Sequence, residues 1–284
     1  MKILVLGATG MAGHTISIYL KERGHDITAY SRREFKYCNN INGDITNFSF
    51  LKSVIKEGGY DGVINAIGIL NKDAEENKSL AVLLNSYLPH YLSDITKNME
   101  TKIIHMSTDC VFSGKKGRYS ETSFRDGETF YDRSKALGEL ENHKDLTFRN
   151  SIIGPDMNKD GIGLFNWFMK QEGEINGFTK AIWTGVTTLT LAKAMEKALE
   201  ENLTGLYNLV NNESISKYEL LKLFNKHMRD ESIKISPIAG VKLDKSLINN
   251  RDDFSFIVPS YEQMVIEMKE WIESHTELYP HYFV

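Results

Sequence analysis

The stretch that decides the fold is MKILVLGATGMAG, residues 1–13. Residues 2–6 form a short apolar run rich in β-branched side chains, which predicts a strand buried on both faces. Residues 11–21 carry apolar side chains at helical spacing, with Ile16, Tyr19 and Leu20 on one side. A strand, a glycine-rich turn and a helix in this order are typical of the first unit of a dinucleotide-binding sheet.

Gly7, Gly10 and Gly13 give the turn the spacing GxxGxxG. In such a unit Gly7 permits the tight turn, Gly10 lets the backbone approach a pyrophosphate, and Gly13 lets helix and strand pack closely. The helix N-terminus then offers free N–H groups and a partial positive charge to the phosphates. An ordinary tight turn between a strand and a helix has the same appearance, and this alternative stays open here.

The composition excludes several classes of protein. The 34 basic and 38 acidic residues among 284 give a net charge of -4, so we expect no nucleic-acid binding. Cys38 and Cys110 are far apart, which favours a reducing compartment without disulfides or zinc, and the eight histidines form no metal-binding pattern. The chain opens on a strand and has no apolar run of about 18 residues, so we expect no signal peptide, no membrane span and a cytoplasmic location.

Strand and helix patterns alternate along the first half of the chain. We expect further strands near 26–30, 60–65, 102–106 and 146–149, and helices near 48–56, through 80–88 with a kink at Pro89, and near 131–142. This alternation predicts an α/β fold, a Rossmann-type doubly wound parallel sheet with helices on both faces.

Beyond residue 150 the alternation loosens. Short strands are expected near 182–183, 206–210 and 233–235, and helices near 164–171, 189–199, 217–227 and 261–272. We therefore predict an NAD(P)-binding domain over 1–150 and a smaller substrate-binding lobe over 151–284, with some segments of the lobe returning to the main sheet. The cleft between them would lie at the carboxyl ends of the strands, where open α/β sheets bind ligands.

Ser31, Arg32 and Arg33 follow the second predicted strand. An acidic residue at this place holds the ribose 2′-hydroxyl of NAD, whereas arginine accommodates the 2′-phosphate of NADP. The pair of arginines therefore favours NADP(H), with NAD(H) as the other possible cofactor. The alternative is that both are solvated loop charges.

Tyr131 and Lys135 are four residues apart, so on a helix they share a face. A phenol has a pKa near ~10, and a nearby ammonium lowers this pKa by favouring the phenolate. Such a tyrosine can exchange a proton near neutral pH. Ser107, Thr108 and Asp109 end an earlier strand, where a hydroxyl can bond a substrate carbonyl. The alternative for YxxxK is a surface pair on a helix.

These motifs together resemble the extended short-chain dehydrogenase/reductase superfamily. The segment STDCVF, residues 107–112, is similar to the S-T-D-x-V-F signature of dTDP-4-dehydrorhamnose reductases and related sugar-nucleotide reductases. Glu121-Thr122 and the KALGE of residues 135–139 match that family's E-T and K-x-x-G-E. The resemblance implies reduction of the 4-keto group of a dTDP- or UDP-linked 6-deoxy sugar by NAD(P)H, in the biosynthesis of a surface-polysaccharide sugar.

The resemblance also implies roles for individual residues. Thr108, Tyr131 and Lys135 would be catalytic, and Tyr131 and Lys135 would also contact the cofactor. The other cofactor contacts would be Gly7, Thr9, Gly10 and Met11 at the pyrophosphate, Ser31, Arg32 and Arg33 at the ribose, Asp44 and Ile45 at the adenine, Ala66 and Gly68 along the nucleotide path, and Asn85 in a structural or ribose-side role. The substrate contacts would be Asp109, Cys110, Arg149, Ile152 and Trp183, although a tryptophan after a strand is more often part of the core.

This chain departs from the family pattern at three positions. Gly127 stands where a proline often precedes the tyrosine, Cys110 replaces a common tyrosine, and Ile152 replaces a tryptophan that packs on the sugar. We expect no metal and leave a homodimer open.

Two other functions compete with the reductase. An epimerase or dehydratase of the same superfamily is one, but dehydratases usually carry a glutamate where Asp109 is followed by Cys110. A non-catalytic NADP-binding regulator is the other, but such proteins usually lose the tyrosine or the lysine. A reductase consumes one reduced cofactor per substrate, whereas an epimerase shows no net change of cofactor.

Overall fold

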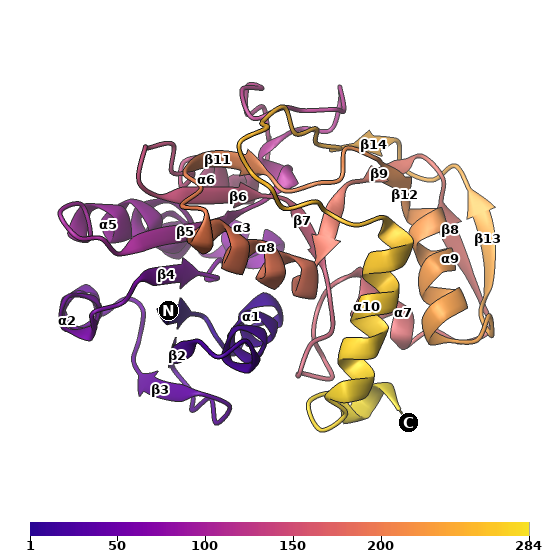
Figure 1. Ribbon diagram of the computed structural model, residues 1–284. Coiled ribbons are helices and arrows are strands. Elements are labelled where there is room, and N and C mark those ends of the chain that lie inside the picture. Colours follow the sequence, from indigo (N-terminus) through magenta and orange to yellow (C-terminus); the bar gives the residue numbers. More distant parts are fainter. Residues whose placement is uncertain (284) are drawn as a thin grey trace.

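A seven-stranded parallel sheet forms the centre of the computed structural model, which describes residues 1–283 (Figure 1). The strand order is β11-β6-β5-β4-β1-β2-β3, and every neighbouring pair is parallel. The chain order reverses between β1 and β4, so the crevice at the carboxyl ends of these two strands is the expected ligand position. The strands are β1 (Lys2–Leu6), β2 (Asp26–Ser31), β3 (Asn39–Asn42), β4 (Gly62–Asn65), β5 (Lys102–Ser107), β6 (Leu146–Arg149) and β11 (Gly205–Asn208).

Helices cover both faces of this sheet, which confirms the doubly wound fold. Side chains alternate along β1, so Ile3 and Val5 enter one apolar cluster and Leu4 and Leu6 enter the other. The first face packs on α1 (Met11–Glu22) and α8 (Thr188–Glu200), and the second on α2 (Phe48–Gly58) and α5 (Leu88–Ile95). Burial on both faces explains why β1 reads as a continuous apolar run.

The helical stretch after β4 is broken by a wide turn that the sequence did not predict. It consists of α3 (Asn71–Glu76), α4 (Lys78–Ala81), the π-helical segment η1 (Val82–Tyr87) and then α5. Pro89 lies in the first turn of α5, and its ring would clash with the Asn85 carbonyl in a regular α-helix. The wider π turn accommodates this clash, and such turns occur often at functional sites. Pro89 therefore widens the helix where a kink was expected.

The second half of the chain contributes to the main sheet and also forms separate small sheets. Strand β11 pairs with β6 and helix α8 packs on α1, as expected for segments that return to the main sheet. The division at residue 150 stays a proposal. The remaining elements are η2 (Asp109–Val111), α6 (Phe130–Ala136), β7 (Ser151–Ile153), α7 (Leu164–Met169), β8 (Glu174–Phe178), β9 (Ala181–Trp183), β10 (Gly185–Thr187), β12 (Ile215–Ser216), α9 (Lys217–Met228), β13 (Lys234–Ile238), β14 (Leu243–Asp244), α10 (Tyr261–Ser274) and η3 (Pro280–Tyr282).

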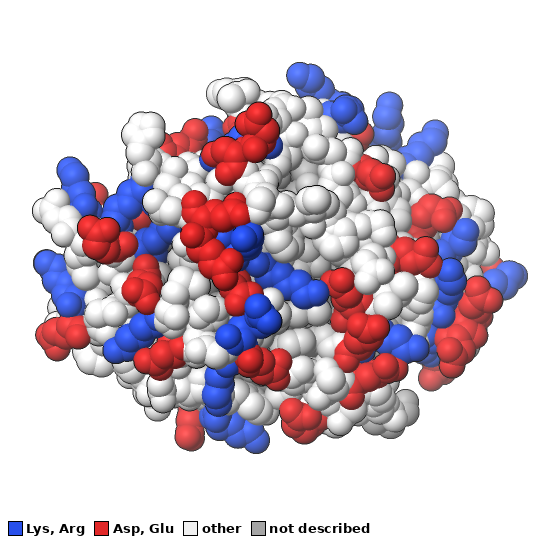
Figure 2. Space-filling view, viewed as in Figure 1, with Lys and Arg blue, Asp and Glu red and all other residues white. Residues whose placement is uncertain are grey.

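Charged side chains of both signs are interspersed over the face shown in Figure 2. None of the helices within residues 1–283 has both the length and the apolar character needed to cross a bilayer. In the same part of the chain, no three His, Cys, Asp or Glu side chains are grouped so that they could hold a metal ion.

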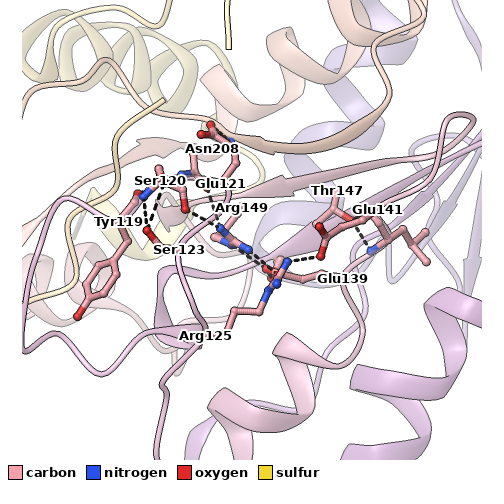
Figure 3. A network of polar contacts seen from close by, with 12 residues as sticks. Tyr119, Ser120, Glu121, Ser123, Arg125, Glu139, Glu141, Thr147, Arg149 and Asn208 are labelled. Carbon is pink, nitrogen blue, oxygen red and sulfur yellow. Dashed lines mark hydrogen bonds and ion pairs between the residues drawn. The ribbon is translucent and has the colours of Figure 1, made fainter. Parts of the chain in front are cut away.

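A buried ion pair joins the ends of β5 and β6 to the chain after α6 (Figure 3). Arg149 is fully buried, and its Nη2 and Nε lie 2.6 and 2.8 Å from the two carboxylate oxygens of Glu139. The Ser107 hydroxyl donates to the same carboxylate at 2.6 Å, and Arg125 pairs with it from the other side. Burial raises the pKa of Glu139, but the hydrogen bond and charge of Arg149, together with Arg125, hold it below its usual value.

We predict that Arg149→Leu destabilises the protein by about 3–5 kcal/mol, because it leaves the Glu139 carboxylate buried without its main partner. The free energy of unfolding, measured by urea denaturation at neutral pH, checks this. Lys115→Met is the matched control, since Lys115 pairs with Glu128 at the surface and its loss should change stability little. Equal effects of the two substitutions would contradict the role given to the buried pair.

Candidate active site

The turn between β1 and α1 has the geometry of an anion-binding turn. Gly7 has a φ of +84°, in the left-handed region that favours glycine. A Cβ at Gly13 would lie 2.1 Å from the Gly7 carbonyl oxygen, which confirms that close packing of helix on strand requires glycine there. Thr9 and Gly10 are exposed, and no side chain caps the first turn of α1. The turn can therefore present N–H groups to a phosphate.

The loop after β2 places the predicted ribose contacts at the edge of the same crevice. Arg32 and Arg33 are exposed, whereas Ser31 is buried and its hydroxyl donates to the Arg33 carbonyl at 2.6 Å. Ser31 thus shapes the loop that carries the two arginines. Hydrogen bonds from the Thr46 N–H and hydroxyl lower the pKa of Asp44, and the charge of Arg32 adds to this effect. Ile45, in contrast, is buried.

The loop after β4 contains Ala66 and Gly68, and Asn85 holds this loop in place. The Asn85 amide donates to the Ile69 carbonyl at 2.9 Å and accepts from the Ile69 N–H at 2.8 Å. It also donates to the Ser134 hydroxyl at 3.0 Å, so it joins the loop to α6. A Cβ at Gly68 would lie 4.0 Å from Lys135 Nζ, which places the predicted nucleotide path beside the predicted catalytic lysine.

Thr108 and Tyr131 lie together beyond the carboxyl end of β5. Thr108 caps η2, where its Oγ1 accepts from the Cys110 N–H and donates to Asp109 Oδ1, both at 3.1 Å. Tyr131 lies in the first turn of α6, which begins with a reciprocal cap between Thr129 and Asp132. The Thr108 hydroxyl is near enough to the Tyr131 phenol to act on the pKa of that phenol. The structure thus brings together the hydroxyls that the sequence placed 23 residues apart (108 to 131).

The expected lowering of the Tyr131 pKa is wrong for this structure. Burial raises the pKa of the Tyr131 phenol, Cys110 adds to this, and the nearby Thr108 hydroxyl only partly opposes it. The expected partner, Lys135, points its Nζ at the Met106 carbonyl oxygen, 2.6 Å away. Tyr131 is consequently a protonated phenol at neutral pH, which is a proton donor.

Lys135 is itself strongly perturbed. Its side chain is buried, and burial lowers its pKa to about 8, although the charge of Glu139 opposes the shift. Its Nζ also lies 3.4 Å from Nε2 of His105, a fully buried residue of β5. Nothing in the local sequence around His105 separates it from an ordinary core histidine, so its contact with Lys135 could not be predicted.

Asp109 and Cys110, two predicted substrate contacts, lie directly beside Thr108. Burial raises the pKa of the Asp109 carboxyl, and the charges of Lys245 and Lys217 oppose this shift. Burial also raises the pKa of the Cys110 thiol to about 12, so this thiol is not a nucleophile at neutral pH. Both residues can therefore shape this region, but Cys110 does not supply an activated group.

Of the other three predicted substrate contacts, Arg149 and Trp183 are buried, and Ile152 stays a prediction. Arg149 is fully buried and occupied by Glu139, so it lies beneath the site and is not available to the substrate. Trp183 packs against Tyr261 with ring centroids 5.6 Å apart and is only 6% exposed, as the core alternative predicted. Ile152, in β7, is half-buried against the main apolar cluster.

An apolar pocket of about 530 Å³ lies in the second half of the chain, between α7, β8 and α9. Lys217, at its wall, also carries a positive charge that acts to lower the pKa of Asp109, so the charge of this wall reaches the Thr108 region. The sequence did not predict this pocket. The only indication of it in the sequence is a group of aromatic and apolar residues after position 160. The lining residues are Leu164, Trp167, Ile175, Asn176, Phe178, Lys217 and Leu221.

Comparisons with known proteins agree with this arrangement. The family described as "RmlD substrate binding domain" matches residues 1–248. The spore coat polysaccharide biosynthesis protein SpsK of Bacillus subtilis is 26% identical over 227 residues, which cover 77% of this chain and 76% of that protein. A dTDP-4-dehydrorhamnose reductase of Aggregatibacter actinomycetemcomitans is 32% identical over 141 residues, 49% of this chain and 45% of that protein.

The fold is also that of a solved relative. The dTDP-4-dehydrorhamnose reductase of Bacillus anthracis, crystallised in complex with NADP, superposes with a TM-score of 0.79 at 22% identity, over 96% of this chain and 99% of that one. Since the family match spans most of the sequence and includes the glycine turn, Thr108, Tyr131 and Lys135, the chain belongs to the RmlD substrate binding domain family.

Proposed function

We propose that this protein uses NAD(P)H to reduce the 4-keto group of a nucleotide-linked 6-deoxy sugar, as a step in polysaccharide biosynthesis. The main observation behind the proposal is that a buried, protonated Tyr131 phenol lies near the Thr108 hydroxyl. Membership of the family and the reductase activity named for its relatives support the same reaction.

The residues around the glycine turn fit a dinucleotide. Gly13 leaves free the space that a Cβ would fill, so α1 can begin directly against β1. The first turn of α1 has no side-chain cap, so its N–H groups can bind a pyrophosphate. In the proposal Gly7, Thr9, Gly10 and Met11 hold the pyrophosphate, and Lys135 holds the nicotinamide ribose. When bound, the reduced nicotinamide supplies the hydride. The structural relative from Bacillus anthracis, which binds NADP, supports this assignment.

Tyr131 supplies the proton in this proposal. Because burial keeps its phenol protonated at neutral pH, Tyr131 can donate to the carbonyl oxygen as negative charge develops there. Thr108, whose position is fixed by the Cys110 N–H, becomes a second donor toward the same oxygen when its proton turns from Asp109 Oδ1 to the substrate. Fixed donors contribute most where charge develops in the transition state, because they need no reorganisation.

The apolar pocket beside Lys217 suits the nucleotide of the substrate. Trp167 and Phe178 offer apolar surface to a base, and Lys217 and Lys245 bring positive charge toward a diphosphate. We include dTDP- and UDP-linked sugars in the proposal. The homodimer and the cytoplasmic location stay predictions.

The direct test of the function is turnover of a panel of dTDP- and UDP-linked 4-keto-6-deoxy sugars with NADPH, followed by the absorbance of the reduced cofactor. We expect one cofactor to be oxidised per sugar reduced. A product formed with no net change of cofactor would establish an epimerase instead. Cofactor binding without turnover of any sugar would support the regulator.

We predict that Tyr131→Phe lowers kcat by about 10²–10⁴-fold, since positioned general acids typically supply that much. Cofactor affinity, measured by fluorescence titration, should stay near the wild-type value because only one oxygen is lost. Tyr87→Phe, which removes an exposed phenol from η1, is the control and should leave kcat unchanged. A near wild-type kcat for Tyr131→Phe, with hydride transfer shown to be rate-limiting by its isotope effect, would refute the assignment.

We predict that Arg32→Ala lowers kcat/KM for NADPH by roughly 10-fold or more and affects NADH little, because a charge-assisted bond to the 2′-phosphate is lost. Steady-state kinetics with both cofactors check this. Lys36→Ala removes another exposed cation from the same loop and should change the NADPH to NADH ratio less. A strong wild-type preference for NADH that Arg32→Ala does not alter would show that these arginines are solvated loop charges.

A further inference from the structure

A continuous row of buried polar groups runs behind Lys135, and the proposed mechanism does not use it. Asn65 ends β4 and His105 lies next to it in β5, and both are fully buried. The Asn65 amide nitrogen lies 3.1 Å from His105 Nδ1, and His105 Nε2 lies 3.4 Å from Lys135 Nζ. The row ends at the Met106 carbonyl oxygen, 2.6 Å from the same Nζ.

One backbone group fixes the direction of every hydrogen bond in this row. The Ile67 N–H donates to Asn65 Oδ1 at 3.2 Å, so the oxygen of that amide faces Ile67 and its NH₂ group faces His105. Since an NH₂ group only donates, His105 Nδ1 must be the acceptor and carry no proton. A neutral imidazole then has its proton on Nε2, the nitrogen that faces Lys135.

We propose that His105 is a positioning residue that presents its Nε2–H to Lys135 and thereby favours the neutral amine form of this lysine in the enzyme without cofactor. An ammonium has three donors and no acceptor, so it would face the imidazole N–H as donor against donor. A neutral amine accepts from Nε2–H and can still donate to the Met106 carbonyl.

The charges around the pair agree with this assignment. Burial lowers the pKa of His105 well below its usual value, and the charges of Lys135 and of His90 on α5 add to the effect. Burial likewise lowers the pKa of Lys135, with Glu139 as the carboxylate that opposes the shift. Tyr131, on the same helix, stays a neutral phenol. His105 is therefore neutral. Asn65 sets its tautomer, so Lys135 faces the protonated Nε2.

The consequence for the reaction rests on the proposed function. A lysine whose pKa lies near the working pH changes charge within that pH range. Lys135 can therefore become cationic when the cofactor binds and negative charge develops on the Tyr131 phenol. The pH profile of kcat/KM for NADPH reports groups of the free enzyme, so its basic limb would follow Lys135.

The test begins with the full-length protein without cofactor or substrate. Nitrogen-15 NMR of labelled histidine reads the tautomer directly, and we expect a proton on Nε2 of His105. Carbon-13 NMR at the ε-carbon of Lys135, assigned with Lys135→Met, follows the lysine titration. His105→Leu removes the N–H donor, and we expect the pKa of Lys135 to rise by about one pH unit.

His90→Leu is the matched control, because His90 is an exposed histidine that bonds the Leu137 carbonyl at 2.8 Å and makes no hydrogen bond to Lys135. It should leave the tautomer unchanged and the Lys135 titration close to wild type. Should His105→Leu fold poorly, His105→Gln removes the imidazole while keeping a polar side chain and should also raise the pKa of Lys135. An Nδ1–H tautomer in the wild type, or a Lys135 titration that neither variant moves, would overturn the proposal. These readouts need no turnover, so they stand apart from any failure of the proposed function.

Discussion

The close contact between Gly13 and the Gly7 carbonyl is the constraint on which the rest of the molecule depends. Because a Cβ at Gly13 would lie 2.1 Å from that oxygen, only glycine lets α1 start directly against β1. This start places the first turn of α1 at the point where the strand order reverses. It also sets the position of α1 on the sheet, where α8 from the second half packs, with Tyr19 of α1 donating to Glu196 of α8 at 2.9 Å. One contact thus positions both the cofactor turn and the returning part of the chain.

A buried polar layer beneath the carboxyl ends of β4, β5 and β6 supports the site. Glu139 joins Arg149 to Ser107, and Asn85 joins the loop after β4 to α6. Buried pairs of this kind add little net stability, but breaking one is costly, so they act mainly to hold one arrangement. That arrangement holds the segments that carry Thr108 and Tyr131, which the proposed mechanism needs in fixed positions.

The sequence predicted what depends on neighbours along the chain. The buried strand β1 and its glycine turn follow from spacing alone, so the fold could be predicted. The catalytic roles expected of Thr108, Tyr131 and Lys135 come from the resemblance to a known family. The raised pKa of Tyr131, the burial of Arg149 and the contact of His105 with Lys135 depend on elements that meet only in the folded protein. Strand β3 (Asn39–Asn42) was not predicted, because its polar residues show no strand pattern. It lies at the edge of the sheet, where such residues can still pair with β2.

The central claim is that this buried phenol serves a hydride transfer to the C4 carbon of a nucleotide-linked sugar. The most direct measurement uses NADPH deuterated at the transferable position, with the sugar product analysed by mass spectrometry and NMR. We expect one deuterium per product molecule, bonded to C4 of the sugar, and an equal amount of oxidised cofactor. A product without deuterium at C4, or deuterium that remains on the cofactor while the sugar changes, would contradict it.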